Sequence, residues 1–315
     1  MSQPSPTSAD QARATFPRGL VQPEGGFRFA VDALLLASFA APQDGARVLD
    51  LGAGCGVIGL AVLLLDGERT RVVGVDRDPA MVLAARENAV RLGLDEHYEI
   101  MELDVRSLRH DPRVQAESFD AVLTNPPYRR PGQGRRSPSP ARDAARFETA
   151  GGLEDFLAAA AYALRNKGTL FCIFSAQRLR DLLEGCVATG LEPKRILPVH
   201  GRSGDEARLV LVQARKNGNP GLSLEPGLVL YRNPSHGGGL SNEALAFCPW
   251  LACNMRGSSD TDVDPCAGPP GIGSDCPGCA PGACSACPTP TSRPRRPSGD
   301  GPATASRPWP SSARP

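Results

Sequence analysis

The sequence predicts an α/β domain in which a mostly parallel sheet, covered by helices on both faces, ends in an antiparallel hairpin. Short β-rich runs alternate with helical patterns between residues 46 and 214, which is typical of parallel strands joined by crossover helices. The last two β-rich runs are separated by a turn that is too short to hold such a helix. A glycine-rich turn follows the first strand, at the edge where open α/β sheets bind ligands.

The predicted strands are short and rich in apolar residues. They cover residues 47–51, 71–76, 98–103, 119–124, 168–174, 191–199 and 207–214. Helices are predicted between them at 57–65, 79–92, 153–166 and 176–189. The second helix is the best defined, because Asp78 can cap its amino terminus, Pro79 suits the first helical position and Gly93 follows its end.

The final hairpin narrows the fold further. The strands at 191–199 and 207–214 are joined by a turn around residues 201–204, so they should pair antiparallel. Seven strands, of which six could run parallel, resemble the class I Rossmann-like fold of S-adenosylmethionine-dependent methyltransferases. A plain dinucleotide-binding Rossmann domain would end in another parallel strand.

Composition divides the chain into one domain and two flanking segments. Of the 315 residues, 31 are Pro, 34 are Gly and 10 are Cys, and all three types are dense beyond residue 255. Such a segment cannot bury enough apolar surface to offset its ordering entropy. We therefore expect a globular methyltransferase domain at 14–255, a disordered amino terminus at 1–13 and a disordered tail at 256–315.

Charge and hydrophobicity exclude several classes of protein. With 35 basic and 34 acidic residues, the chain has no global field that would attract nucleic acid or an anionic membrane. The longest apolar run, residues 57–65, is too short to cross a bilayer, and the amino terminus lacks an apolar signal core. We expect a cytoplasmic protein that has no membrane contact and no obligate protein partner.

The cysteines indicate reduced thiols. Cys55, Cys172 and Cys186 are spaced irregularly within the regular part of the domain, which does not suggest a disulfide framework. Two C-x-x-C pairs, at 276–279 and 284–287, have only four residues between them, whereas zinc ribbons usually place about 15 to 20 there. We therefore predict no metal site.

The glycine-rich turn predicts a nucleotide-containing cofactor. Its sequence is Asp50-Leu51-Gly52-Ala53-Gly54-Cys55-Gly56. The alternate glycines remove every Cβ that would hold a ligand away from the backbone. Residues 54–59 also fit the dinucleotide pattern G-x-G-x-x-G, so the glycines alone leave two cofactors open.

Three acidic residues favour S-adenosylmethionine. Asp50 precedes the turn, where a carboxylate would repel a pyrophosphate but face the ammonium of a methionine moiety. Asp76 ends the second strand and could accept hydrogen bonds from both ribose hydroxyls. Asp104 follows the third strand and could meet the adenine amino group.

The motif Asn125-Pro126-Pro127-Tyr128 (NPPY) follows the fourth strand, at the same edge of the sheet. A planar amino or amide nitrogen is a poor nucleophile because its lone pair is delocalised. The Asn125 side-chain oxygen and the Pro126 carbonyl could accept its two N–H hydrogens and stabilise the positive charge that develops. Pro127 stiffens the turn, and Tyr128 offers a face on which a base can stack. The motif leaves open the amino group of adenine, guanine or cytosine, or the side-chain amide of glutamine.

Residues around these motifs resemble one family. The segments 22–37, 135–148 and 207–212 are similar to the bacterial tRNA1(Val) adenine-N6-methyltransferase family, over about residues 18–255. Leu240 stands where members usually have a tyrosine. The resemblance implies that S-adenosylmethionine is bound by Asp50, Gly52, Ala53, Gly54, Gly56, Asp76, Asp104 and Asn125, with further contacts from Phe29 and Asp32. It also implies that residues 125–128 hold an adenine.

An arginine-rich segment beyond the motif favours RNA as the substrate. Arg129, Arg130, Arg135 and Arg136 follow the predicted catalytic turn, where they could contact phosphates of tRNA. The alternatives are N5-methylation of a glutamine in a protein such as a release factor, or methylation of another amino group in rRNA or DNA. The release-factor enzymes typically carry a separate amino-terminal helical domain, and only about 40 residues precede the first predicted strand here.

Overall fold

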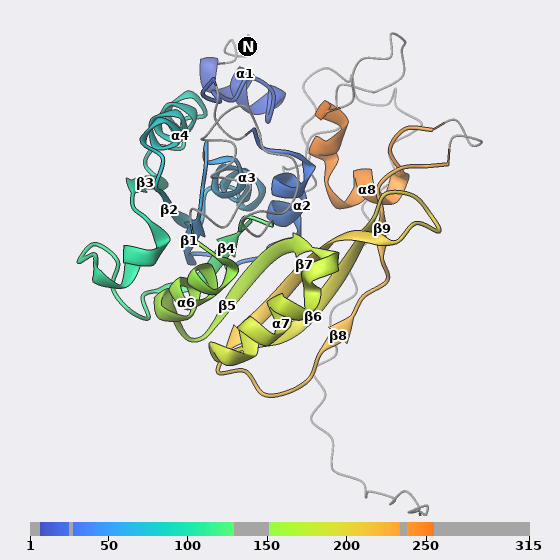
Figure 1. Cartoon of the computed structure of the whole chain (residues 1–315). Helices are drawn as coiled ribbons and strands as arrows, with labels where there is room; N and C mark the ends of the chain where they lie inside the picture. The colour runs from blue at the N-terminus through green and yellow to red at the C-terminus, as the bar shows by residue number, and fades with distance from the viewer. Residues whose placement is uncertain (1–6, 25–27, 129–150, 234–237, 255–315) are drawn as a thin grey trace, which may run out of the picture. The chain divides into compact units, whose positions relative to one another are not determined.

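A computed structural model describes residues 7–24, 28–128, 151–233 and 238–254. Within these residues a single sheet carries helices on both of its faces (Figure 1). The predicted tail at 256–315 and the arginine-rich segment after Tyr128 lie outside them.

Seven strands form the main part of the sheet in the order β3-β2-β1-β4-β5-β7-β6. They are β1 (Arg47–Leu51), β2 (Arg71–Asp76), β3 (Tyr98–Glu102), β4 (Phe119–Thr124), β5 (Leu164–Ser175), β6 (Leu191–His200) and β7 (Ala207–Lys216). β1 to β5 run parallel to one another, and β7 lies antiparallel between β5 and β6. The predicted class I fold is therefore confirmed, including its antiparallel hairpin.

Two further strands, β8 (Ser223–Leu224) and β9 (Leu228–Val229), pair with the outer side of β6. They were not predicted. Each has only two residues, so neither shows the alternation of apolar and polar side chains from which longer strands are recognised.

The helices divide between the two faces of the sheet. One face carries α2 (Val31–Phe39), α3 (Val57–Asp66) and α4 (Pro79–Arg91), which share a buried apolar cluster with it. The other face carries the 3-10 helix η1 (Val105–His110), α6 (Leu153–Ala163) and α7 (Leu179–Ala188), which share a second cluster. Because adjacent residues of a strand point to opposite faces, Val48 joins the first cluster and Leu49 the second.

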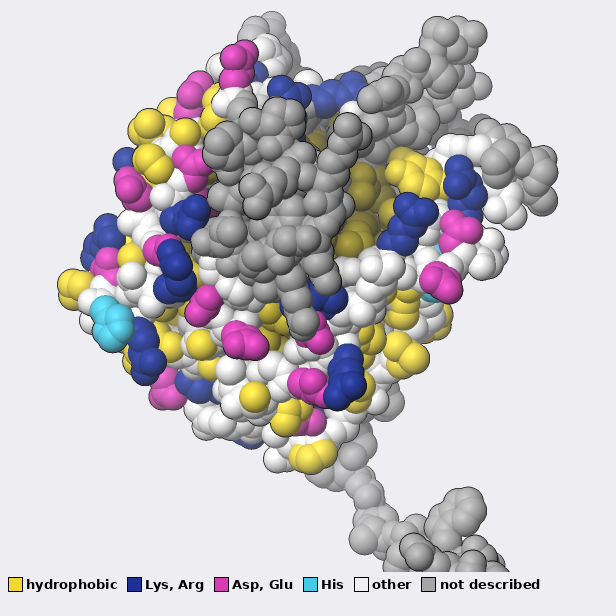
Figure 2. Space-filling view, in the orientation of Figure 1, with side chains coloured by type: hydrophobic (Ala, Val, Ile, Leu, Met, Phe, Trp, Pro, Cys, Tyr) yellow, Lys and Arg dark blue, Asp and Glu magenta, His cyan; other side chains and the backbone are white. Residues whose placement is uncertain are grey.

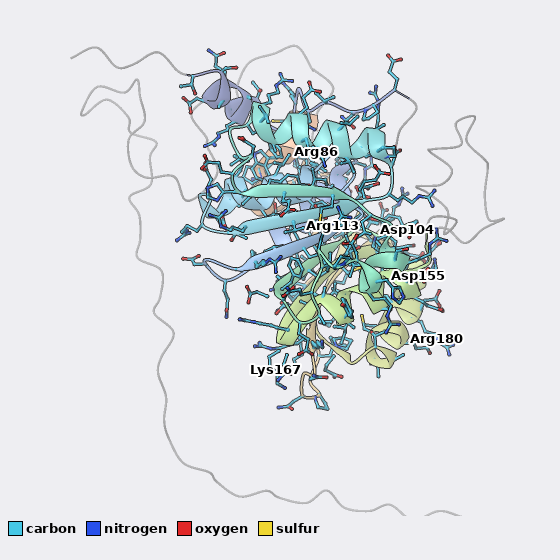
Figure 3. The ribbon with its side chains drawn as sticks, turned by 90° about the vertical axis from the view of Figure 1, so that its left-hand side faces the viewer. Arg86, Asp104, Arg113, Asp155, Lys167 and Arg180 are labelled. Carbon is cyan, nitrogen blue, oxygen red and sulfur yellow. The ribbon has the colours of Figure 1, made fainter. Side chains whose placement is uncertain are left out.

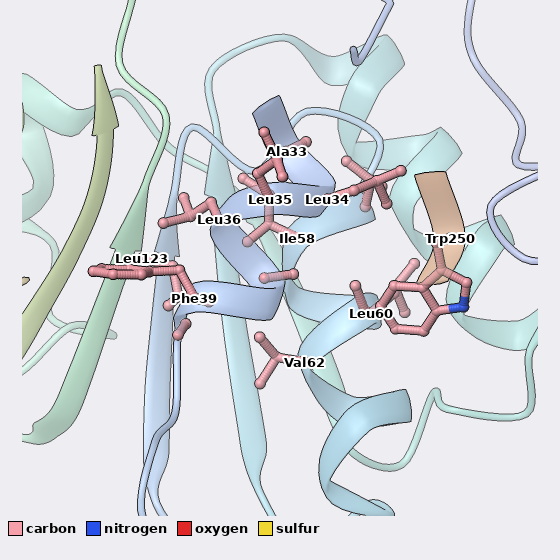
Figure 4. Packing of buried hydrophobic residues seen from close by; sticks show 14 of the residues in the cluster. Ala33, Leu34, Leu35, Leu36, Phe39, Ile58, Leu60, Val62, Leu123 and Trp250 are labelled. Atoms are coloured by element: carbon pink, nitrogen blue, oxygen red, sulfur yellow. The ribbon is translucent and has the colours of Figure 1, made fainter. Parts of the chain in front are cut away.

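The helix α2 has apolar neighbours on several sides. Leu34, Leu35 and Leu36 are all fully buried although they are consecutive, and Figure 4 shows them beside Ile58 of α3. The helix also contacts β5, α8 (Asn242–Phe247) and the 3-10 helix η5 (Pro249–Asn254). Burying a leucine side chain contributes about 1.5–3 kcal/mol, so these contacts anchor the start of α2 at the carboxyl edge of the sheet.

The structure corrects the prediction that residues 1–13 are disordered. The helix α1 (Ser8–Thr15) begins within that segment. Thr7 and Asp10 form a capping box at its start, and Arg13 donates hydrogen bonds to the carbonyl oxygens of Leu92 and Gly93 at 2.6 and 3.0 Å. These polar contacts stabilise α1, a helix that the Ser/Pro-rich composition did not indicate. Residues 1–6 lie outside the described part of the chain.

The helix predicted at 153–166 is wrong for its last three residues. Leu164 begins β5, and it pairs with Phe119 of β4 through an irregular register. Arg165 forms an ion pair with Asp120 at 2.7 Å, so strand pairing prevails over continuation of the helix here. The helix predicted at 176–189 begins instead with a 3-10 turn, η3 (Ala176–Arg178), before α7.

The cysteines within the described ranges are all free. Cys55, Cys172, Cys186 and Cys248 are buried, and Cys253 is partly exposed. Reduced thiols were predicted for the first three of them, and this is confirmed. In the same ranges, no helix is both long and apolar enough to cross a membrane.

Candidate active site

The glycine-rich turn and the NPPY turn begin at the ends of neighbouring strands. β1 and β4 are paired in register, with Leu51 opposite Thr124. The Thr124 hydroxyl donates a hydrogen bond to the Leu51 carbonyl oxygen at 3.2 Å. Since adjacent strands lie about 4.8 Å apart, Gly52 and Asn125 leave the sheet side by side.

The glycine-rich turn bends back over the end of β2. Gly52 and Ala53 both donate N–H hydrogen bonds to the Val75 carbonyl oxygen, at 2.9 and 3.0 Å. Gly54 and Gly56 have φ values of +57° and +85°, which residues with a Cβ rarely adopt. A Cβ on Gly54 would meet nothing within 4 Å, whereas one on Gly56 would lie 3.0 Å from the Tyr98 hydroxyl. Gly54 therefore faces open space, and Gly56 packs against the protein.

Asp76 holds this turn through its carboxylate. One oxygen accepts the Gly54 N–H at 2.8 Å and the other accepts the Asp78 N–H at 2.9 Å. Burial raises the pKa of Asp76 above its usual range. Each carboxylate oxygen has a further lone pair, so the residue retains the capacity to accept the two ribose hydroxyls. That role stays a prediction.

Asp50 is fully buried beneath the same turn. Its Oδ2 accepts the Gly59 N–H at 3.1 Å, in the first turn of α3. Its Oδ1 has no partner among the atoms of the described residues. Burial raises the pKa of Asp50 to about 7, and the negative charge of Asp76 adds to that effect. The unpaired acceptor fits a ligand that brings a hydrogen-bond donor, as an ammonium group does, although the contact itself stays a prediction.

Asp104 has a structural role at the end of β3. It caps η1 by accepting the Arg106 N–H at 2.9 Å, and it forms an ion pair with the Arg106 guanidinium at 2.6 Å. The side-chain hydrogen bond from Arg106 holds the pKa of Asp104 below its usual range. In Figure 3 Asp104 lies near Asp155 of α6, the helix that packs on η1. Contact of Asp104 with an adenine stays a prediction.

The NPPY turn is held mainly by side chains of β5 and η3. The ring of Tyr128 lies edge-on to that of Phe174, with 5.5 Å between centroids. Arg178 donates a hydrogen bond to the Tyr128 carbonyl oxygen at 3.1 Å and lies over the Phe174 ring. Pro126 is buried, while Asn125, Pro127 and Tyr128 are partly exposed. The motif is therefore fixed in place with part of its surface accessible.

Asp32 hydrogen-bonds a residue of the NPPY turn, and its predicted contact with the cofactor stays a prediction. Its side chain is buried at the start of α2, where Oδ2 accepts a hydrogen bond from the Tyr128 hydroxyl at 3.0 Å. Its Oδ1 accepts the Ala33 N–H at 2.9 Å. The Tyr128 hydroxyl also lies 2.5 Å from Oδ1 of Asn125. The opening segment, by which we mean the described residues 21–24 and 28–37, thus reaches the predicted catalytic turn.

Phe29 is half-buried against the apolar cluster that contains α2. This packing gives Phe29 a structural role, and a cofactor contact stays a prediction. Arg129, Arg130, Arg135 and Arg136 lie outside the described residues. On the face seen in Figure 2, acidic and basic side chains alternate, in line with the near-zero net charge.

Asn88 is a residue of the site that the sequence analysis missed. It lies fully buried on α4, where its amide donates to the carbonyl oxygens of Cys55 and Val21 at 2.9 and 3.1 Å. Its Oδ1 accepts the Val21 N–H at 2.7 Å. Asn88 therefore ties the opening segment to the glycine-rich turn. The available signal was an amide at helical spacing among Ala84, Ala85 and Ala89 on the buried side of the helix.

A family comparison accounts for this arrangement. The model of the methyltransferase small domain matches residues 30–189, a range that runs from the residue before α2 to the end of α7. The chain belongs to that family. The protein is therefore a methyltransferase, and the resemblance seen in the sequence is confirmed.

Curated relatives agree with this assignment. The tRNA1(Val) (adenine(37)-N6)-methyltransferase of Actinobacillus succinogenes is 29% identical over 189 residues, which cover 60% of this chain and 77% of the relative. The protein of the same name from Aeromonas hydrophila is 30% identical over 190 residues, covering 59% and 75%. The crystal structure of a predicted O-methyltransferase from Agrobacterium tumefaciens is 26% identical with a TM-score of 0.56, and the match covers 69% of this chain and 95% of that one.

The residues of the glycine-rich turn fit S-adenosylmethionine, the methyl donor of such enzymes. Gly54 leaves room beside the backbone, and Asp50 has a buried acceptor without a partner among the described atoms. Asp76 brings a second carboxylate to the same turn. Two carboxylates suit the ammonium and the ribose of this cofactor, and Asp50 would repel the pyrophosphate of a dinucleotide.

Proposed function

We propose that this methyltransferase transfers the methyl group of S-adenosylmethionine to the exocyclic N6 amino group of an adenine in tRNA. The observation that carries the proposal is the juxtaposition of the two turns, because the paired residues Leu51 and Thr124 bring the glycine-rich turn beside the NPPY motif. The names of the curated relatives support adenine in tRNA as the acceptor. We also propose a cytoplasmic location, where tRNA is modified.

In this proposal the glycine-rich turn binds the cofactor. Asp50 meets the ammonium of its methionine moiety, Asp76 accepts from the ribose hydroxyls, and Gly52, Ala53, Gly54 and Gly56 let it approach the backbone. S-adenosylmethionine supplies a methyl group on a positively charged sulfur, which is a good leaving group. Strong activation of the acceptor is then unnecessary, so the protein contributes mainly position and electrostatic stabilisation.

The NPPY turn holds the acceptor. The Asn125 side-chain oxygen and the Pro126 carbonyl oxygen accept the two N–H hydrogens of the adenine amino group, which directs the nitrogen lone pair towards the methyl group. Both oxygens then stabilise the positive charge that forms on this nitrogen. The base stacks on the Tyr128 ring, and the arginines at 129, 130, 135 and 136 contact phosphates of the tRNA.

Methyl transfer to tRNA tests the proposal. We expect purified protein, incubated with labelled S-adenosylmethionine and unmodified tRNA, to yield N6-methyladenosine in mass analysis of the nucleosides. Asn125→Ala should lower kcat by about 100-fold or more, since removing one transition-state hydrogen-bonding group of this kind typically costs that much. Asp44→Asn, at an exposed ion pair with Arg69, is the matched control and should keep full activity.

Other products would identify other functions. Label in a release factor, with none in tRNA, would point to glutamine N5-methylation. Label in rRNA or DNA alone would keep the chemistry and change the substrate. Label on an oxygen atom of a small phenol would place the protein with the O-methyltransferases, and each of these three results would contradict the proposal.

A further inference from the structure

Three polar side chains form a short chain at the acceptor side of the site. Asp32 comes from the first turn of α2, whereas Tyr128 and Asn125 come from the NPPY turn. The Tyr128 hydroxyl lies between the other two, 3.0 Å from Oδ2 of Asp32 and 2.5 Å from the side-chain oxygen Oδ1 of Asn125. Segments almost 100 positions apart in the sequence thus meet at one hydroxyl group.

The hydroxyl has a single proton, so it can donate to only one of these neighbours. An ionised carboxylate can only accept, and it is the stronger acceptor of the two. With Asp32 ionised, the Tyr128 proton therefore goes to Asp32. The contact with Asn125 must then run in the other direction, with the amide nitrogen donating to the Tyr128 oxygen. A 180° rotation of an amide exchanges its oxygen and nitrogen without changing its shape, so the geometry allows this.

We propose that Asp32 sets the direction of this chain of hydrogen bonds, in which Asn125 donates to Tyr128 and Tyr128 donates to Asp32. Asp32 thereby turns the Asn125 oxygen towards the target amino group. The proposal rests on the proposed function, in which that oxygen accepts an N–H of the adenine. Asp32 is thus a positioning residue of the acceptor site. It acts through Tyr128 and does not touch the substrate.

Other contacts support the direction of the chain. Among the residues that the structure describes, Asp32 forms no ion pair, and its carboxylate accepts hydrogen bonds from Tyr128 and Ala33. Its Oδ1 is occupied by the Ala33 N–H at the amino end of α2, where a negative charge interacts favourably with the helix dipole. Burial, and then the negative charge of Asp32, raise the pKa of Tyr128 well above its usual range, so the hydroxyl keeps its proton.

The isosteric change Asp32→Asn should reverse the donor-to-acceptor direction of these hydrogen bonds. The Ala33 N–H donates to Oδ1 of residue 32 at 2.9 Å and, at a longer distance, to the Ala30 carbonyl oxygen at 3.3 Å. Because the shorter contact favours an oxygen at this position, we expect the new amide to keep its oxygen there and to turn its nitrogen to Tyr128. The hydroxyl then donates to the Asn125 oxygen and removes it from the substrate. We expect kcat to fall by about 30-fold, because an acceptor group in the transition state is lost. The Kd for S-adenosylmethionine should stay within about twofold.

Tyr128→Phe provides a test that loss of structure would not imitate. Without the hydroxyl nothing in the chain can draw the Asn125 oxygen away, so this variant should lose only about fivefold in kcat. The double variant of Asp32→Asn with Tyr128→Phe should match Tyr128→Phe alone. It should thus be faster than Asp32→Asn, since the two residues act through one contact. Asp44→Asn serves again as the matched control.

A spectroscopic measurement tests the direction without any activity. The side-chain amide signal of Asn125, assigned by its loss in Asn125→Ala, should have the shift of a hydrogen-bonded donor in the wild type. It should move towards that of a free amide in both Asp32→Asn and Tyr128→Phe.

Three results would overturn the inference. The first is multiplicative losses of kcat in the double variant. The second is an Asn125 signal that does not move in Asp32→Asn. The third is a weaker affinity of Asp32→Asn for S-adenosylmethionine at unchanged kcat, which would make Asp32 a cofactor contact instead. If the wild type fails to methylate tRNA, the proposed function fails, and the amide signal still decides the direction of the chain.

Discussion

The two turns of the site are held by different kinds of contact. At the glycine-rich turn, buried or partly buried carboxylates accept backbone N–H groups, with Asp50 on Gly59 and Asp76 on Gly54. At the NPPY turn, the side chains of Asp32, Tyr128 and Asn125 contact one another. In the proposed function, backbone conformation and cofactor binding therefore depend on the same atoms at the first turn, whereas at the second a side chain can change while the backbone stays in place.

This difference predicts that substitutions at the two turns change different properties of the protein. Changes at the glycine-rich turn should lower stability and cofactor affinity together, because we propose that the carboxylates serve both. Changes at the NPPY turn should lower the rate of methyl transfer with little loss of stability. Three measurements test this division, beginning with the one that should change the free energy of unfolding most.

The largest effect is a pH dependence of stability that originates at Asp50. Its pKa is about 7 in the folded protein, against an ordinary value of 3.8. Between about pH 4 and pH 7 the folded state therefore holds a proton that the unfolded chain has released, so the free energy of unfolding decreases as the pH rises. The decrease is on the order of 4 kcal/mol at most, and it ends above the folded pKa.

Urea unfolding of the cofactor-free protein between pH 5 and pH 8 measures this slope. Asp50→Asn cannot titrate and should flatten it, leaving the part that the raised pKa of Asp76 contributes. The lowered pKa values of Asp104 and Asp111 act at lower pH and do not interfere. An unchanged slope in Asp50→Asn would show that the carboxyl is not buried in the way described.

The second effect concerns Asp76. Asp76→Ala leaves the N–H groups of Gly54 and Asp78 without their acceptor, and we expect a loss of about 2 kcal/mol of stability, because water replaces part of the bonding at this partly exposed site. Affinity for S-adenosylmethionine should fall at the same time. Calorimetry of unfolding and of cofactor binding measures both. A variant that loses affinity with full stability would contradict the proposed dual role.

The smallest effect separates two glycines of the same turn. Gly54→Ala places a methyl group in open space, so it should cost about 1 kcal/mol of stability from its positive φ and mainly weaken cofactor binding. Gly56→Ala brings the same strain and also presses a methyl group against Tyr98 and Ala85, at 3.0 and 3.2 Å. It should therefore be the less stable variant in thermal unfolding. The reverse order would contradict the open space that the structure places beside Gly54.

Much of the fold could be predicted because its signals are local. The alternation of strands and helices, the capped start of α4 and the short turn between β6 and β7 can each be recognised within a few residues. The two motifs could be placed side by side because parallel strands end at one edge. The boundary between α6 and β5 could not be predicted, since Leu164 becomes a strand residue only through its pairing with Phe119.

The partners of single side chains were the least predictable part of the site. Asp32 lies 96 positions from Tyr128 in the sequence, and nothing in its surroundings along the chain indicates a hydroxyl partner. Asp104 was assigned to an adenine, but its capping of η1 depends on how the chain turns after β3. Such contacts follow from the packing of whole elements, and a motif does not encode them.

The hydrogen bonds of Asn88 connect Val21 to the glycine-rich turn, where we propose that the cofactor binds. The Val21 amide hydrogen is held by the same side chain that holds the Cys55 carbonyl of the glycine-rich turn. Any ligand that steadies this turn must also slow the exchange of the Val21 amide with solvent deuterium. The rate of that single exchange would then report occupancy of the donor site before any substrate has arrived.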